Sequence, residues 1–220
     1  MSTTNITITL GGAVVAAVMF TSPASAAPAT PTPVDLSNPA FAASTGPTSI
    51  PVGAVDFCRR DPADCGPEAH VQTVETLSQQ SWQQLLSVNA DVNARIIPET
   101  DQDNYHVAEY WTYPTDGRGD CEDIALEKRR ELIADGWDPS ALLMTVVRES
   151  NGDGHAVLMV RTDRGDLILD NQDGRILLWN QTPYDFIKRQ SQANAGQWVG
   201  LNDNRSTIAA AQQIVAGSTK

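Results

Sequence analysis

The sequence predicts an α+β fold, with helices in the N-terminal half of the chain and an antiparallel sheet in the C-terminal half. Apolar residues recur at helical spacing over residues 71–92, and a second helical segment covers residues 121–135, where Gly136 follows as a helix C-cap. After Pro139 the pattern changes to short apolar runs separated by turns rich in Gly, Asp and Asn. These runs lie at 141–147, 155–160, 167–169 and 176–179. Helices followed by an antiparallel meander make up the α+β class.

Three further segments complete this prediction. Residues 93–119 contain two Pro and two Gly, which indicates a loop, although four aromatic side chains lie in it. Residues 184–191 are interpreted as a short helix, and residues 197–201 as a last strand.

The composition indicates one globular domain with an acidic surface. The chain has 220 residues, of which 41% are hydrophobic, enough for one core with flanking segments. Its formal net charge of −12 argues against nucleic acid or an anionic membrane as a partner. The same charge is compatible with cation binding.

Residues 1–26 have the pattern of a secretory signal peptide. The apolar stretch at 6–20 is shorter than the roughly 20 residues that a membrane span needs, and an A-x-A type cleavage site follows at 22–26. No Lys or Arg precedes the apolar stretch, so only the terminal amine is positive there. We therefore expect a periplasmic or secreted protein without stable membrane insertion after cleavage.

The segment after the signal peptide is expected to be a linker. Residues 27–52 are rich in Pro, Ala, Ser and Thr and carry little charge. The folded domain is expected at 53–204, followed by a C-terminal tail at 205–220 that frays.

Three cysteines support an oxidising compartment. Cys58 and Cys65 bracket a short polar loop, and a disulfide is the simplest use of such a pair in an exported chain. A zinc site is the alternative, but the spacing is wide and no second Cys/His pair lies downstream. Cys121 remains unpaired, and an odd cysteine in such a protein requires an explanation.

Cys121 lies at the predicted start of the second helix, within residues 119–123 (GDCED). Asp120 is placed to cap this helix, and Asp123 to complete a capping box. Free backbone N–H groups and the helix dipole favour a thiolate at Cys121 and can stabilise an oxyanion. The flanking carboxylates, including Glu122, raise the pKa of a thiol, and a bound cation would remove that conflict. A small buried cysteine in a helix is the structural alternative.

A histidine and a carboxylate are predicted to meet on the sheet. If residues 163–164 form a two-residue hairpin loop, Val157 lies opposite Asp170, and His155 lies two residues farther along the same face. His155 and Asp170 are then diagonal neighbours, about 7–8 Å apart, close enough for imidazole to reach carboxylate. Taken alone, His155 could be a strand-end residue and Asp170 the start of a turn. With Cys121 they have the composition of a catalytic triad.

Three blocks of the sequence resemble the bacterial transglutaminase-like cysteine peptidases, a family that includes the LapG-like periplasmic proteases. The blocks are residues 119–123 (GDCED), 154–158 (GHAVL) and 169–171 (LDN). The similarity extends over residues 71–201, and the Cys58/Cys65 pair is typical of a stand-alone branch. The resemblance implies a papain-like fold, in which a nucleophile at a helix N-terminus packs on an antiparallel sheet.

The resemblance also implies roles for individual residues. Cys121 corresponds to the nucleophile, His155 to the base and Asp170 to the carboxylate that orients it. Asp120, Glu122 and Asp123 correspond to positions associated with calcium. Because calcium takes 6–8 oxygen ligands, loop carbonyls or the carboxylates of Asp101 and Asp103 would have to contribute. Alternatively, these acids only complement the positive end of a helix.

We therefore expect an exported cysteine peptidase that cleaves a protein of the cell surface or envelope through a thioester, with calcium as its expected cofactor. The same triad would serve a protein-glutamine acyl transferase or an amidase, and incorporation of an added amine would distinguish these. A catalytically silent envelope-binding module is the third alternative, and a reactive Cys121 would exclude it.

Overall fold

A computed structural model of the protein describes residues 34–71, 74–203 and 205. The expected signal peptide at 1–26 and the tail beyond residue 205 lie outside the described residues. Among the described helices, none has both the length and the apolar character needed to cross a bilayer.

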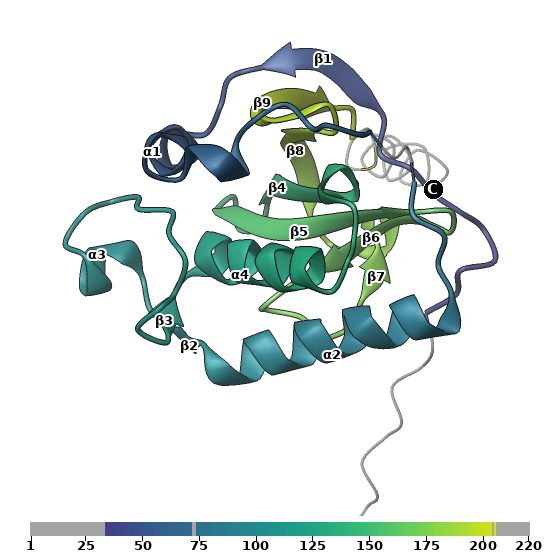
Figure 1. Cartoon of the computed structure of the whole chain (residues 1–220), viewed down its shortest axis with the longest axis horizontal. Coiled ribbons are helices and arrows are strands. Elements are labelled where there is room, and N and C mark those ends of the chain that lie inside the picture. The colour runs from purple at the N-terminus through teal and green to yellow at the C-terminus, as the bar shows by residue number, and fades with distance from the viewer. Residues whose placement is uncertain (1–33, 72–73, 204, 206–220) are drawn as a thin grey trace, which may run out of the picture. The chain divides into compact units, whose positions relative to one another are not determined.

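A mixed arrangement of helices and an antiparallel sheet confirms the α+β prediction (Figure 1). In the described part of the chain, the main sheet has the strand order β1-β9-β8-β4-β5-β6-β7. A second, parallel pair joins β2 (Ile97–Pro98) to β3 (Arg118–Gly119). The strands of the main sheet are β1 (Ser44–Thr48), β4 (Leu142–Arg148), β5 (Gly154–Thr162), β6 (Gly165–Leu169), β7 (Leu177–Leu178), β8 (Asp185–Ser191) and β9 (Asn194–Leu201).

Helices pack against one face of this sheet (Figure 1). Side chains from that face and from the helices form the larger core, which includes Leu85, Leu132 and Leu158. A smaller core on the opposite face includes Val157 and Phe186. The helices are α1 (Val52–Arg60), α2 (Gln79–Arg95), α3 (Asp101–Asn104) and α4 (Cys121–Ala134), with single 3₁₀ turns η1 (Pro62–Asp64), η2 (Pro139–Ala141) and η3 (Trp179–Gln181).

The hairpin register between β5 and β6 is the one predicted from the sequence. Thr162 pairs with Gly165 across a two-residue loop, and Leu158 pairs with Leu169. One step farther along this ladder, Val157 is level with Asp170. Two consecutive residues of β5 point to opposite faces, so His155 and Val157 share a face while Ala156 points to the other.

Both ends of α4 lie where the sequence indicated, but its N-terminal cap differs. Gly136 has a φ of +94°, and the amides of Gly136 and Trp137 donate to the carbonyls of Ile133 and Leu132, which closes the helix. Asp120 occupies the N-cap position without a hydrogen bond from its side chain to the helix. The predicted side-chain cap and capping box are therefore wrong, because the carboxylate of Asp120 faces other acids instead.

The prediction of a helix at 184–191 is wrong, because residues 185–191 form β8. This strand pairs with β4 on one side and with β9 on the other. Its backbone hydrogen bonds thus go to β4, which is distant in the sequence, and to β9, its hairpin partner. This pairing overrides the weak local pattern.

Two N-terminal segments also differ from the sequence-based expectation. The helix expected at 71–92 begins only at Gln79, because Ser78 and Ser81 form a capping box there. Glu75 pairs instead with the β5–β6 hairpin, accepting from the amide of Asp163 at 2.7 Å. Within the expected linker, β1 adds to the edge of the sheet beside β9.

Cys58 and Cys65 form the disulfide that the sequence indicated, with their Cα atoms 5.4 Å apart. The bond joins the end of α1 to a segment that contacts the β8–β9 hairpin. There the amide of Ala195 donates to the carbonyl of Gly66 at 3.1 Å, and the amide of Glu68 donates to the carbonyl of Ala193 at 3.0 Å. The disulfide thus fixes the N-terminal elements to the sheet.

We predict that a thiol reagent labels Cys121 alone when the unreduced protein is denatured, and all three cysteines after reduction. Peptide mapping by mass spectrometry gives the readout. Replacing Cys58 and Cys65 with Ala should lower the free energy of unfolding by about 2–3 kcal/mol, the contribution of a closed loop of this length. Three labelled cysteines in the unreduced protein would contradict the disulfide.

Candidate active site

Cys121 is the first residue of α4 and is half-buried. Its thiol donates to the carboxylate Oε2 of Glu122 at 3.1 Å, and its Sγ accepts from the amide of Ala156 at 3.4 Å. The helix start therefore lies directly against β5, one residue from His155. Cys121 thus lies at the helix start, the position that the sequence predicted.

His155 and Asp170 form a buried hydrogen-bonded pair. Nε2 of His155 lies 2.9 Å from Oδ1 of Asp170, and both side chains are at most 3% exposed. Oδ1 also accepts from the amide of Gln172 at 2.9 Å, and Oδ2 accepts from the hydroxyl of Tyr184 at 2.5 Å. Burial alone would raise the pKa of Asp170, but the hydrogen bonds from His155, Tyr184 and Gln172 hold it below its ordinary value.

The other imidazole nitrogen faces Gln172. Nδ1 of His155 lies 3.4 Å from the side-chain amide of Gln172, which also donates to Glu149 at 2.8 Å. In the described part of the chain, no hydrogen bond joins the thiol of Cys121 to this imidazole. The structure thus unites His155 with Asp170 and places Cys121 beside them. Bonds between nucleophile and base commonly tighten only when substrate binds.

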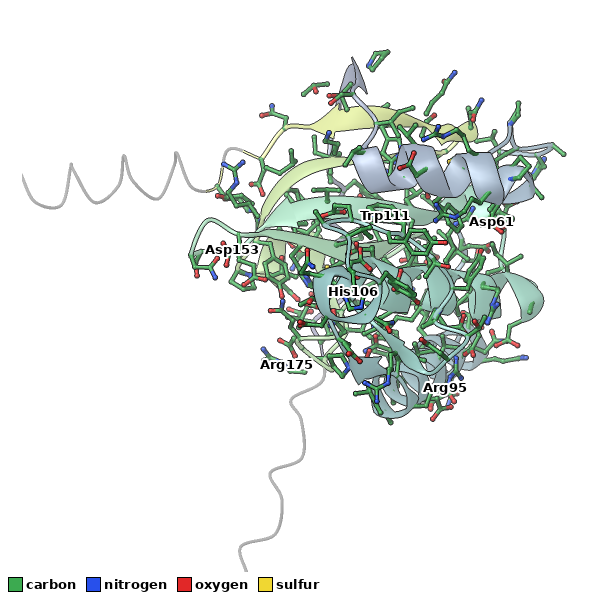
Figure 2. All side chains as sticks on the ribbon, turned by 90° about the vertical axis from the view of Figure 1, so that its left-hand side faces the viewer. Asp61, Arg95, His106, Trp111, Asp153 and Arg175 are labelled. Atoms are coloured by element: carbon green, nitrogen blue, oxygen red, sulfur yellow. A yellow bond between two sulfur atoms is a disulfide. The ribbon has the colours of Figure 1, made fainter. Side chains whose placement is uncertain are left out.

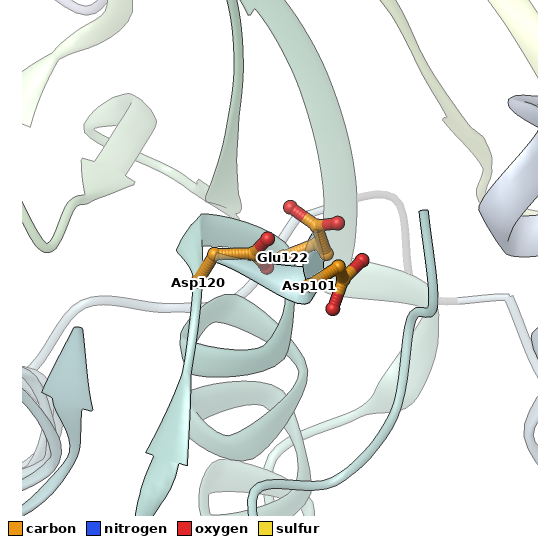
Figure 3. A group of neighbouring side chains, drawn as sticks. All are labelled: Asp101, Asp120 and Glu122. Atoms are coloured by element: carbon orange, nitrogen blue, oxygen red, sulfur yellow. The ribbon is translucent and has the colours of Figure 1, made fainter. Parts of the chain in front are cut away.

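Three carboxylates gather at the start of α4. Asp101, Asp120 and Glu122 each offer an oxygen within 4.8 Å of the others, and their side chains point toward one another (Figure 3). Asp101 comes from α3, and the sequence-based prediction included it only as an additional ligand beside Asp120, Glu122 and Asp123. Asp123 is directed elsewhere, because its Oδ1 accepts from the amide of Thr112 at 2.7 Å.

Burial strongly perturbs these acids. Burial, assisted by the charge of Asp120, raises the pKa of Glu122 to about 9, and burial raises the pKa of Asp120 to about 6. Burial and the carboxylate of Glu122 also raise the pKa of the Cys121 thiol well above its usual value. Without a cation, the cluster therefore opposes formation of a thiolate.

The cluster has the donor chemistry of a calcium site. Oδ1 of Asp101, Oδ1 of Asp120 and Oδ2 of Asp123 are buried without a hydrogen-bond partner. An unpartnered buried oxygen is costly and is commonly explained by an ion or water. Hard carboxylate oxygens with no His or Cys among them suit calcium better than zinc. The residues present therefore fit the ion that the resemblance implies.

Trp111, labelled in Figure 2, belongs to the core beside the site. Its ring packs edge-on against Trp198 of β9, and its indole N–H donates to Glu109 at 3.2 Å. A Cβ atom on Gly53 of α1 would meet the indole at 2.2 Å. This close contact requires glycine at position 53, and it packs α1 against the segment that follows α3.

Tyr184, Gln172 and Lys128 also lie at the site, although the sequence pattern did not indicate them. Tyr184 was assigned to a helix, and nothing local indicated its contact with Asp170. Lys128 lies two turns after Cys121 on α4, and its side chain is 1% exposed. Burial lowers its pKa to about 7, while Asp170 acts in the opposite direction. Lys128 follows Cys121 by seven residues, a spacing that puts both on the same face of a helix. This spacing could have indicated that Lys128 lies near the site.

Solved structures similar to this chain include three of LapG from Legionella pneumophila. Calcium-bound LapG from Legionella pneumophila is 28% identical with a TM-score of 0.45, covering 50% of this chain and 64% of that one. A second structure of that LapG is 27% identical with a TM-score of 0.46, covering 58% and 72%. An EGTA-treated form is 28% identical with a TM-score of 0.46, covering 57% and 73%. The chain thus spans less than two thirds of the calcium-bound form.

No curated protein matches the sequence. The family model described as bacterial transglutaminase-like cysteine proteinase matches residues 44–206, well over half of the chain. The match includes β1, α1 and the disulfide as well as the site. The chain therefore belongs to the bacterial transglutaminase-like cysteine proteinases.

Proposed function

We propose that this protein is an exported cysteine peptidase in which Cys121 is the nucleophile, His155 the base and Asp170 the carboxylate that orients it. The observation that carries the proposal is the buried 2.9 Å bond between His155 and Asp170, together with the bond from the amide of Ala156, the residue after His155, to the sulfur of Cys121. Family membership supports the reaction class. The signal-like sequence at 1–26 and the disulfide support export, and with it a protein substrate of the cell envelope.

In this proposal, each nitrogen of His155 has its own task. Nε2 is held by Asp170, so Nδ1 is the atom that takes the thiol proton. The thiolate attacks the amide carbonyl, and the oxyanion lies against the amides at the start of α4. The tetrahedral intermediate collapses to a thioester while Nδ1 protonates the departing amine. Water then loses a proton to Nδ1, attacks the thioester, and releases the acid and the free thiol.

We further propose that calcium is held by Asp101, Asp120 and Glu122, with Asp123 as a further candidate ligand because its Oδ2 is buried without a hydrogen-bond partner. When bound, the ion supplies positive charge that offsets these carboxylates and lowers the pKa of the nearby thiol. The unpartnered oxygens of Asp101 and Asp120 support this assignment. The chain itself contributes rigidity, because α3 and α4 are brought together by the β2–β3 pair.

We predict that Cys121→Ser and His155→Ala abolish acylation by p-nitrophenyl acetate, an activated ester that reports thiol reactivity without a known substrate. Asp170→Asn should be nearly as severe, since the equivalent change in a serine-protease triad lowers kcat about 10⁴-fold. Stopped-flow absorbance measures the acylation burst, and circular dichroism checks that each variant folds. Full activity in His155→Ala would exclude this mechanism.

We predict that EGTA suppresses acylation reversibly and lowers the melting temperature. Calcium at 100 times its Kd should add about 2.7 kcal/mol to the free energy of unfolding if only the folded state binds it. Glu122→Gln should weaken calcium binding at least tenfold, whereas Glu131→Gln, on the same helix but outside the acidic cluster, should not. Calorimetry measures both affinities, and unchanged melting in EGTA would remove calcium from the account.

We predict that calcium binds more tightly as the pH rises from 6 to 9. The pKa of Glu122 is raised to about 9 and that of Asp120 to about 6, so the empty cluster retains a proton at neutral pH. Calcium binds the ionised carboxylates and must release that proton. Calorimetric titration with calcium in buffers of different ionisation enthalpy measures the number of protons released. An affinity that is constant over this pH range would contradict the assignment of these two ligands.

A further inference from the structure

Tyr184 contacts both partners of the buried pair. Its hydroxyl donates to Oδ2 of Asp170 at 2.5 Å, and its ring lies 5.4 Å from the imidazole of His155 at an interplanar angle of 57°. We propose that Tyr184 is a positioning residue of the triad, which fixes the carboxylate and the imidazole so that Nδ1 remains for the thiol of Cys121. This inference rests on the proposed function and adds a positioning residue to the proposed triad.

The hydrogen bonds on Asp170 show why a hydroxyl is needed at this point. His155 Nε2 and the amide of Gln172 both bind Oδ1, and neither of them contacts Oδ2. The hydroxyl of Tyr184 binds the other oxygen. Donors on both oxygens fix the plane of the carboxylate, and this plane sets the direction in which the imidazole points.

The backbone that carries Tyr184 is itself held in place. Arg205 donates to the carbonyl of Trp179 at 3.2 Å, to that of Thr182 at 3.1 Å, and to that of Tyr184. Asp203 orients the guanidinium through bonds of 2.8 and 2.6 Å. One arginine therefore bridges three carbonyls of a single turn, and Tyr184, which is 7% exposed, approaches Asp170 from a fixed support.

Charged groups around the pair define the electrostatic test. Lys128 acts on Asp170 from α4, while Glu149 after β4 and Asp173 in the turn after Asp170 act on the Tyr184 hydroxyl. The hydroxyl is one of three donors that lower the pKa of Asp170 against the effect of burial. Removing the Tyr184 hydroxyl should therefore raise the pKa of Asp170. The charges of Lys128, Glu149 and Asp173 stay in place.

Tyr184→Phe tests the proposal, because it removes the hydroxyl and keeps the ring against His155. Tyr113→Phe is the matched control, since that hydroxyl also bonds a carboxylate, Asp64, away from the triad. With p-nitrophenyl acetate, Tyr184→Phe should lower the rate constants of acylation and deacylation about 10- to 100-fold, the range for a hydrogen bond to a charged group, with KM unchanged. Tyr113→Phe should match the wild type in both rate constants.

Carbon-13 NMR of labelled aspartate supplies a readout that does not depend on turnover. The titration of Asp170 should move to higher pH in Tyr184→Phe and stay in place in Tyr113→Phe. Wild-type rates and an unmoved titration in Tyr184→Phe would overturn the proposal, as would an equal loss of rate in both variants. If the wild type itself shows no acylation that depends on His155, the proposed function fails, and the titration still reports the Tyr184 bond.

Discussion

The hydrogen bond between His155 and Asp170 depends on one constraint, the two-residue turn that sets the register of β5 against β6. Gly165 closes this turn at a φ of +110°, and a Cβ atom there would meet the backbone of Ala40 at 2.7 Å. One inserted residue would turn one strand over and place His155 and Asp170 on opposite faces. The Gln172 amide and the Tyr184 hydroxyl also bind the carboxylate that this register positions.

At the nucleophile, two electrostatic effects oppose each other, and their magnitudes decide which dominates. A helix N-terminus favours a negative group by at most about 2 kcal/mol. One like charge about 4 Å away disfavours it by about 4 kcal/mol at an effective dielectric of 20. Glu122 lies 3.1 Å from the sulfur, so a charged cluster outweighs the helix and keeps Cys121 protonated. In the proposed function, a bound divalent ion would offset this negative charge, and the acids would then control the thiol through the ion.

The parts of the site that could be predicted from sequence are those fixed by local geometry. The start of α4 follows from Gly119 and the apolar pattern behind it, and the β5–β6 register follows from the turn. The missed parts depend on pairing between distant segments. Residues 184–191 mix charged and apolar side chains without clear alternation, so β8 is defined by its neighbours β4 and β9. Tyr184 therefore reaches Asp170 through contacts that no local pattern encodes, and α3 brings Asp101 to Asp120 in the same way.

In the proposed function, Cys121 and His155 together cleave a protein by hydrolysis. The most direct measurement incubates isolated cell-envelope proteins in heavy-oxygen water with the wild type, Cys121→Ala or His155→Ala, and identifies new termini by mass spectrometry. The account predicts that only the wild type generates new N-termini, each matched by a new C-terminal carboxylate that carries heavy oxygen. The same termini in either variant would contradict the roles of Cys121 and His155. Products in which an amine, instead of heavy oxygen, is joined to the new C-terminus would contradict hydrolysis.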